Sequence, residues 1–277
     1  MYRVRVLSGS TPTASKVSSM LSASSTDLLA VALLAAFAAV VAGFVWQARR
    51  RLPLTLAQSF WYGVNYIIAR ILWRAQVTRP LPVAPDRGAV IVCNHRSSLD
   101  PSFIETATDR VVHWMVAKEY CTHWAFGWIL RLVEVIPVSR GGIDTGATKA
   151  AIRYARGGGL VALFPEGRIN TTERLLLPGR PGAAMIALKA RVPVIPCYVH
   201  GSPYDGTTLG CLLMPAKVDV RIGRPMDLSE YYGREDERDV LEQLTKRFLV
   251  AIATLAGSPD FQPELAGRFY KPRSGRQ

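Results

Sequence analysis

The sequence is poor in cysteine and lacks the residue clusters that hold a metal or build a disulfide framework. Only four of its 277 residues are cysteines, and no two of them are separated by just two residues. We therefore expect buried free thiols in a reducing compartment, and no zinc or other metal site. The nucleophile-elbow pattern Gly-x-Ser-x-Gly is absent too, which argues against a serine esterase of that type.

Acidic residues are also scarce. The chain has 34 Lys and Arg against 21 Asp and Glu, a formal net charge of +13. A basic surplus of this size indicates an anionic partner, which is nucleic acid, an acidic lipid headgroup or a phosphorylated substrate. No basic helix or aromatic-studded sheet motif of a nucleic-acid-binding domain is present, so we expect no nucleic-acid partner and favour a membrane surface.

The longest stretch without charge lies near the N-terminus. Leu28 to Trp46 contains no charged residue and, as a helix, would extend about 28 Å, close to the thickness of the bilayer core. Three arginines follow it, so the positive-inside rule places the body of the protein in the cytoplasm. We predict a disordered segment at 1–26 and an uncleaved anchor in the inner (cytoplasmic) membrane at 27–51. A cleaved signal peptide is the alternative, but its basic residues would precede the apolar run.

A second apolar segment follows the anchor. Between Leu56 and Gln76 apolar residues recur at helical spacing, and Arg70 and Arg74 form a basic edge. This pattern predicts an amphipathic helix at 52–78 that lies in the membrane interface with its arginines directed toward lipid phosphates. An ordinary core helix of the following domain is the alternative.

The body of the chain predicts an α/β domain. A proline-rich stretch at Arg79 suggests that it begins there, and a helical pattern over Asp236 to Ala256 closes a domain at 79–257, before a basic tail at 258–277. Short apolar runs alternate with helical stretches, which argues for a mostly parallel central sheet flanked by helices. The expected strands are 88–94, 111–117, 134–139, 159–165, 192–200 and 217–223. The expected helices between them are 101–108, 123–133, 144–157 and 182–191.

One candidate catalytic pair follows the first of these strands. His95 and Asp100 are five positions apart and could meet only if the chain turns between them, which Pro101 favours. Asp100 is then expected at the N-cap of a helix, and its carboxylate could hold one ring nitrogen while the other accepts a proton. Since His200 and Asp205 share this spacing, the spacing alone does not identify a site.

Two further strands end in turns that combine glycine with arginine. LFPEGRIN ends an apolar strand and contains Arg168, and VIPVSRGG does the same with Arg140. Glycine allows close backbone approach to a ligand, and a guanidinium suits phosphate. Because ligands of parallel sheets bind beyond the carboxyl ends of the strands, we expect these turns to lie near His95.

Four ordered stretches resemble the motifs of the PlsC-like glycerolipid acyltransferases, in particular the 1-acylglycerol-3-phosphate acyltransferases. They are NHRSSLD with His95 and Asp100, IPVSR ending at Arg140, FPEGR with Glu166, Gly167 and Arg168, and VPVIPCYVHG with Pro196. The similarity covers about half of the chain, from Ala89 to Pro225. Four motifs in the right order are a far more specific signal than any one of them.

The resemblance implies a reaction and roles for the residues. An enzyme of this family moves a fatty acyl group from acyl-CoA or acyl carrier protein to the free hydroxyl of 1-acylglycerol 3-phosphate (lysophosphatidic acid), giving phosphatidic acid, with no cofactor. His95 would be the general base and Asp100 would orient it. The residues implied to hold the acceptor's phosphate are Arg140, Glu166, Gly167 and Arg168.

The sequence departs from the family pattern only in the substrate-binding motifs. Glu134 and Pro137 replace the usual Gly and Phe of the second motif, and the third lacks the Thr that commonly stands between Gly167 and Arg168. The alternatives therefore concern first the acceptor, such as glycerol 3-phosphate or another lysolipid. A membrane-anchored esterase and a non-enzymatic lipid-binding module are less expected. The donor, the chain length, the oligomeric state and a start at Met1 or Met20 stay open.

Overall fold

The computed structural model describes residues 54–124, 126–139, 144–204, 206 and 210–267, and a few single positions between 29 and 43. Residues 52–277 form one compact unit, and residues 1–51 form another. The predicted disordered segment lies outside the described residues, as do most of the predicted anchor and half of the predicted tail. No helix within the described residues is both long and apolar enough to cross a membrane.

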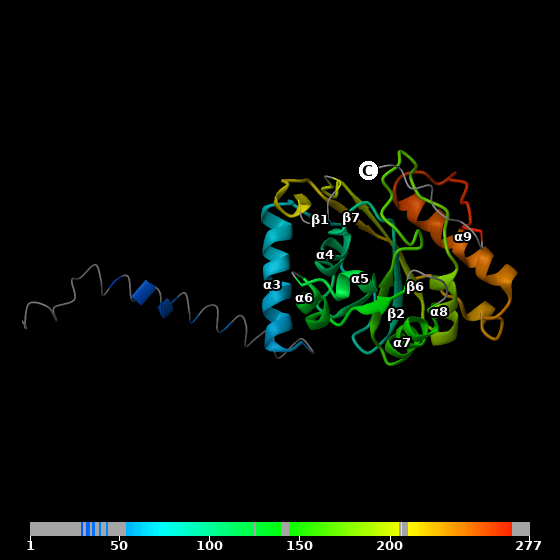
Figure 1. Cartoon of the computed structure of the whole chain (residues 1–277), viewed down its shortest axis with the longest axis horizontal. Coiled ribbons are helices and arrows are strands. Elements are labelled where there is room, and N and C mark those ends of the chain that lie inside the picture. Colours follow the sequence, from blue (N-terminus) through cyan, green and yellow to red (C-terminus); the bar gives the residue numbers. More distant parts are fainter. Residues whose placement is uncertain are drawn as a thin grey trace, which may run out of the picture. The chain divides into compact units, whose positions relative to one another are not determined.

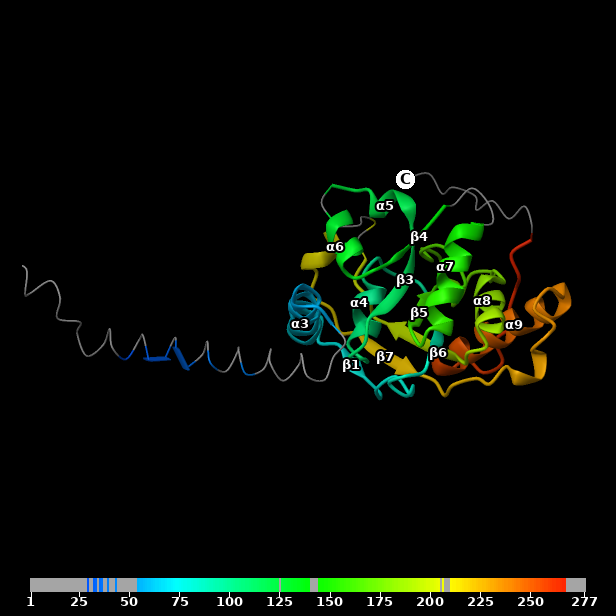
Figure 2. The same cartoon turned by 90° about the horizontal axis from the view of Figure 1, so that it is seen from below.

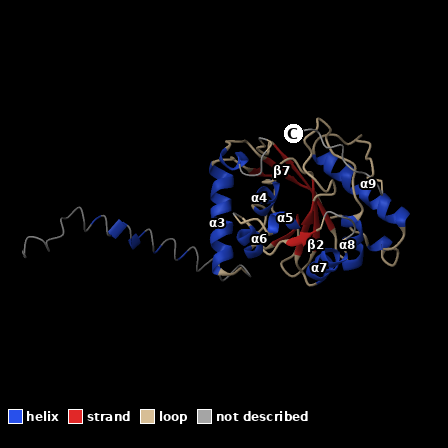
Figure 3. Cartoon of the chain, in the orientation of Figure 1, coloured by secondary structure: helices blue, strands red, loops and turns tan. Residues whose placement is uncertain are grey.

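A sheet forms the centre of the larger unit (Figure 3). It has seven strands in the order β1-β7-β6-β2-β5-β3-β4. Its strands are β1 (Gln76–Val77), β2 (Ala89–Cys93), β3 (Val112–Ala117), β4 (Ile136–Val138), β5 (Leu160–Leu163), β6 (Val194–His200) and β7 (Asp219–Ile222). Only the pairing of β6 with β7 is antiparallel. The predicted, mostly parallel sheet is thus confirmed, and all six expected strands are present; β1 was not expected.

Helices cover both faces of this sheet (Figures 1 and 2). They are α3 (Leu56–Ile71), α4 (Asp100–Glu105), α5 (Lys118–Cys121), α6 (Gly127–Leu132), α7 (Thr145–Arg156), α8 (Gly182–Ala190) and α9 (Arg238–Leu255). The side chains of β2 alternate between two cores, as strand geometry requires. Val90 and Val92 pack with α7, α8 and α9, whereas Ala89, Ile91 and Cys93 pack with α3 and α4. The centre of the sheet is therefore buried on both sides.

The predicted interfacial helix, α3, packs against the domain. Gln58 Nε2 donates to the Leu132 carbonyl at 2.9 Å, and Asn65 Nδ2 donates to the Ser102 carbonyl at 3.0 Å. Ala69 is fully buried. The proline-rich stretch at 79–88 connects β1 to β2 and lies inside the unit Leu52–Gln277. The opposite side of α3 exposes large apolar side chains: Leu56, Phe60, Tyr66, Ile67, Ile68 and Ile71.

Candidate active site

Two polar segments meet at one edge of the sheet. β2 and β5 are parallel neighbours, so the loop after Cys93 and the turn after Leu163 leave the sheet at the same edge. The rings of His95 and Phe164 stack there, with centroids 3.7 Å apart and planes 3° from parallel. The structure thereby brings together the first and third of the predicted strand ends. Arg140, from the second, lies outside the described residues.

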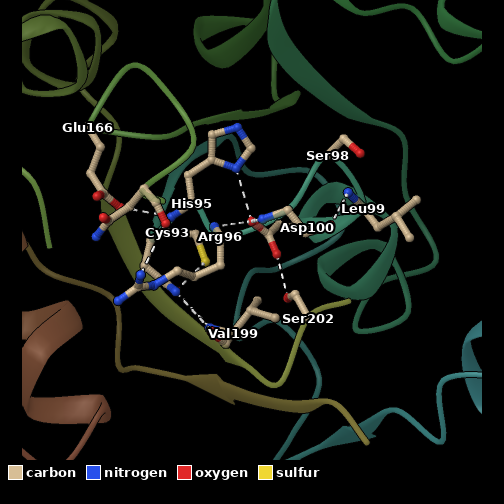
Figure 4. Close-up of polar contacts among 12 residues, drawn as sticks. Cys93, His95, Arg96, Ser98, Leu99, Asp100, Glu166, Val199 and Ser202 are labelled. Carbon is tan, nitrogen blue, oxygen red and sulfur yellow. Dashed lines mark hydrogen bonds and ion pairs between the residues drawn. The ribbon is translucent and has the colours of Figure 1, made fainter. Parts of the chain in front are cut away.

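His95 is held by a buried carboxylate (Figure 4). Its Nδ1 lies 3.0 Å from Asp100 Oδ2, and its side chain is 14% exposed while that of Asp100 is fully buried. The same Oδ2 accepts hydrogen bonds from the backbone N–H groups of Arg96, at 2.7 Å, and Ser97, at 2.8 Å. The other oxygen, Oδ1, accepts from Ser202 Oγ at 2.5 Å. Asp100 thus accepts four hydrogen bonds, and one of them comes from His95.

The expected helix-capping role of Asp100 is wrong. Asp100 is itself the first residue of α4; the N-cap is Leu99, and no side chain caps the helix. Side chains on a helix tilt toward its N-terminus, so the carboxylate projects back over the preceding loop. It therefore bonds the N–H groups of that loop, where a capping side chain would bond those of the first helical turn. Asp100 holds the His95 loop in place and does not cap the helix.

A second buried carboxylate, Glu166, lies on the backbone side of His95 (Figure 4). Its Oε1 accepts from His95 N and its Oε2 from Leu177 N, both at 2.8 Å, and the residue is 3% exposed. Burial raises the pKa of Glu166 to about 7, although these two hydrogen bonds and the charge of Arg96 act in the opposite direction. Both of its oxygens are therefore engaged by backbone, which differs from the expected contact with a phosphate.

The other predicted members of this turn are less buried than Glu166. Gly167 is exposed and has a φ of +70°, a conformation that glycine adopts without strain. Its N–H donates to the Phe164 carbonyl at 3.0 Å and closes the turn. Arg168 follows it and is partly buried. Gly167 and Arg168 thus lie beside the His95 loop, and they remain predicted contacts of the acceptor's phosphate.

Three residues of this site were not singled out from the sequence. Phe164 stacks on His95, and Ser202 bonds Asp100. The guanidinium of Arg96 donates to three carbonyls, those of Asn170, Thr172 and Arg174, and fastens the segment after the turn. The one available signal for Ser202 was its place just after a strand that ends at the same edge of the sheet as β2.

The second His/Asp spacing does not form a comparable site in the described residues. His200 is exposed at the end of β6, and Asp205 lies outside the described residues. All four cysteines are buried, and none of them forms a disulfide in the described residues. In the described part of the chain, no group of three or more His, Cys, Asp or Glu side chains is arranged to hold a metal ion.

The sequence of the chain is similar to sequences of known proteins. Residues 74–200 match the family model named Acyltransferase. A 1-acyl-sn-glycerol-3-phosphate acyltransferase of Streptococcus pneumoniae is 29% identical over 154 residues, which are 55% of this chain and 55% of that protein. One from Bacillus subtilis is 26% identical over 147 residues, 53% of this chain and 70% of the relative. The chain is thus similar to acyltransferases of this family over residues 74–200, the part that contains the predicted motifs.

The fold of the chain is similar to that of a solved structure. The crystal structure of the 1-acyl-sn-glycerophosphate (LPA) acyltransferase, PlsC, from Thermotoga maritima is similar, with a TM-score of 0.54 and 22% identity. The match covers 75% of this chain and 86% of that one. The chain spans about half the length of several of the curated relatives that it matches. The matched family model, the curated relatives and the similar fold thus confirm the resemblance drawn from the motifs.

Proposed function

We propose that the protein is a 1-acylglycerol-3-phosphate O-acyltransferase, of EC 2.3.1.51 type. It moves a fatty acyl group from acyl-CoA or acyl carrier protein to the free hydroxyl of 1-acylglycerol 3-phosphate and yields phosphatidic acid. The observation that carries this proposal is the hydrogen bond between His95 Nδ1 and the buried Asp100. The activity named for the two bacterial relatives supports the choice of acceptor.

His95 acts as the general base. With Nδ1 engaged by Asp100, the tautomer is fixed and Nε2 is left to accept a proton from the acceptor hydroxyl. The oxygen forms a bond to the thioester carbonyl carbon as its proton passes to Nε2, and Asp100 stabilises the imidazolium that results. When the tetrahedral intermediate collapses, the carbon–sulfur bond breaks and the imidazolium returns the proton to the leaving thiolate. Ester and free thiol are the products.

The surroundings of His95 keep the base in one orientation. Phe164 covers one face of the His95 ring. The backbone of His95 is held at both ends: its N–H donates to Glu166, and its carbonyl accepts from the N–H of Asn170 at 2.7 Å. Side chain and backbone are therefore both held, and a base held in place loses little orientational freedom when the substrate binds. Glu166 is a positioning residue in this scheme. Arg168, Gly167 and Arg140 remain the proposed contacts of the phosphate.

The acceptor is a lipid, and the exposed apolar side of α3 offers a membrane contact. Phe60, Ile67 and Ile71 are 62%, 57% and 74% exposed, and Arg70 lies on the same helix. Trp128 of α6, which is 45% exposed, contacts Trp61 of α3 with ring centroids 5.1 Å apart. Apolar and aromatic side chains beside a basic one suit the bilayer interface. We propose that α3 rests on the membrane and that the 27–51 segment anchors the protein there, with the catalytic domain cytoplasmic.

An acceptor panel tests the proposed function. Full-length protein in detergent is given labelled acyl-CoA, or acyl carrier protein loaded with the same acyl group, with one of several acceptors: 1-acylglycerol 3-phosphate, glycerol 3-phosphate and other lysolipids. We expect labelled phosphatidic acid from the first acceptor and no transfer above background with His95→Ala. Equal thiol release by wild type and His95→Ala across the panel would overturn the proposal.

A further inference from the structure

An arginine outside the recognised motifs lies against the turn that contains Gly167. Arg180 is thirteen residues further along the chain, just before α8, and its N–H donates to the Pro165 carbonyl at 2.9 Å. A Cβ atom built on Gly167 would come within 3.1 Å of both Cδ and Nε of Arg180. The side chain of Arg180 therefore passes directly over the glycine, in the space that a side chain at position 167 would need.

The guanidinium of Arg180 is available for a ligand. The residue is exposed, and within the described ranges its side chain has no hydrogen bond or ion pair. Two other arginines nearby differ: Arg96 donates to three backbone carbonyls, and Arg174 forms an ion pair with Glu264. An arginine that lies across a glycine without a protein partner leaves its donors free for an anion.

The place of this guanidinium fits the phosphate of the acceptor. Gly167 directly follows Glu166, which bonds the backbone of His95, so Arg180 lies next to the segment that holds the base. In 1-acylglycerol 3-phosphate only a few bonds separate the reacting hydroxyl from phosphorus. A substrate whose hydroxyl reaches His95 must therefore place its phosphate close by. The glycine keeps the surface open there, and this turn lacks the threonine hydroxyl common in the family.

We propose that Arg180 is a further binding residue for the acceptor's phosphate, which it contacts across Gly167 together with Arg168. The proposal rests on the proposed function, because it names a contact within the same site. A guanidinium offers a phosphate two parallel hydrogen bonds and a full charge. Arg180 does not touch the reacting atoms and is thus a binding residue whose loss weakens binding of the acceptor.

Two variants and a matched control test this assignment. Arg180→Gln removes the charge and keeps a polar, though shorter, side chain. Arg180→Lys keeps the charge and removes the planar guanidinium that can form two parallel hydrogen bonds. Arg174→Gln removes a charge from an exposed arginine of the same segment that is already paired. With 1-acylglycerol 3-phosphate we expect Arg180→Gln to raise the KM about tenfold or more, since hydrogen bonds to charged groups are typically strong. Its kcat should stay within about twofold, Arg180→Lys should be intermediate, and Arg174→Gln should match wild type.

Two further readouts separate phosphate binding from a structural role. The KM for the acyl donor, and any slow transfer to a 1-acylglycerol without phosphate, should be the same in Arg180→Gln and wild type. Glycerol 3-phosphate should protect the protein against thermal unfolding. The concentration that gives half of the maximal rise in Tm should be about tenfold higher for Arg180→Gln than for wild type. An unchanged KM and unchanged protection would overturn the assignment, as would an equal loss of kcat with every acceptor. If wild type transfers no acyl group, the proposed function fails, while the protection measurement still decides whether Arg180 binds phosphate.

Discussion

The loop after β2 and the turn after β5 meet at one edge of the sheet, yet they are built in opposite ways. In the loop, Asp100 and Ser97 are fully buried, and the carboxylate is bonded within the protein at both oxygens. In the turn, Gly167 is exposed and Arg180 lies over it in contact with solvent. The loop is suited to fix a base in one orientation, and the turn leaves room for a charged ligand. The two halves of the proposed site thus differ in burial and in hydrogen bonding.

The two carboxylates around His95 show the same division. Asp100 accepts four hydrogen bonds and contacts the imidazole itself, whereas Glu166 accepts two from the backbone and has a raised pKa. Each hydrogen bond to a carboxylate favours its charged form, and burial opposes it. Asp100 is accordingly placed to stabilise an imidazolium, and Glu166 to hold the chain that carries it. The following variants test this division.

Among the variants that keep His95, the largest effect is expected for Asp100→Asn. An amide can donate to Nδ1 where a carboxylate only accepts, so it favours the wrong tautomer of His95. We expect kcat for transfer to 1-acylglycerol 3-phosphate to fall about a thousandfold with the KM changed little. Steady-state thiol release measures this, and circular dichroism checks that the variant is folded. A folded variant that keeps a tenth of the wild-type kcat would contradict the role of Asp100.

Glu166→Gln should change the pH dependence of stability. The folded-state pKa of about 7 exceeds the ordinary value of 4.5, so the folded protein binds more protons between these pH values than the unfolded chain does. The contribution of Glu166 is therefore fully present below pH 4.5 and is lost as the pH rises through 7. We expect the unfolding free energy of wild type to fall by roughly 3 kcal/mol more than that of Glu166→Gln over this interval.

Urea titrations of both proteins at several pH values measure the difference. Burial also raises the pKa of Glu105, to about 8, but this residue is present in both proteins and its effect cancels in the comparison. Parallel curves for the two proteins between pH 4.5 and 7 would show that Glu166 is not the buried group described.

A smaller effect is expected for Ser202→Ala. Its hydroxyl is the hydrogen-bond donor to Asp100 Oδ1, and without it a fully buried acceptor loses its partner. We expect kcat to fall about tenfold with the KM unchanged, and Ser202→Thr, which keeps the hydroxyl, to recover part of the loss. Ser229→Ala serves as the control, because Ser229 is exposed and bonds Asp227 in another segment. Full activity of Ser202→Ala would remove Ser202 from the group that positions His95.

The smallest effect is expected on α3, which leaves both halves of the site intact. Replacing Phe60, Ile67 and Ile71 together by serine removes apolar surface that is already more than half exposed, so stability should change little. With 1-acylglycerol 3-phosphate in vesicles, kcat/KM should fall severalfold, because the apolar contact with the bilayer is weakened. With a soluble short-chain substrate the rate should equal that of wild type. An equal loss on both substrates would indicate damage to the site and contradict the membrane contact.

Much of the fold was predictable because the strands are short, apolar and separated by helical patterns. The meeting of His95 with Phe164 also followed in outline from the parallel sheet, since neighbouring strands end at the same edge. The contact between Ser202 and Asp100 did not. These residues are 102 positions apart, and only the strand order, which places β6 next to β2, brings them together.

Two other features could not be predicted from the sequence, for physical reasons. α3 has an apolar pattern that fits both a membrane helix and a core helix, and the structure uses one side for packing while the other stays exposed. Arg180 looks like any arginine before a helix; its significance arises only from the close approach to Gly167. The apolar pattern of α3 predicted a helix but not which side of it would pack. No sequence pattern predicted the contact between Arg180 and Gly167.

The most direct test of the central claim compares the two histidines that share one spacing. His95→Ala and His200→Ala are assayed beside wild type for transfer of a labelled acyl group to 1-acylglycerol 3-phosphate. His95 is bonded to a buried carboxylate, and His200 is exposed at the end of β6. We expect His95→Ala to show no transfer above background and His200→Ala to match wild type. Substantial transfer by a folded His95→Ala, or an equal loss in His200→Ala, would contradict the assignment of His95 as the base.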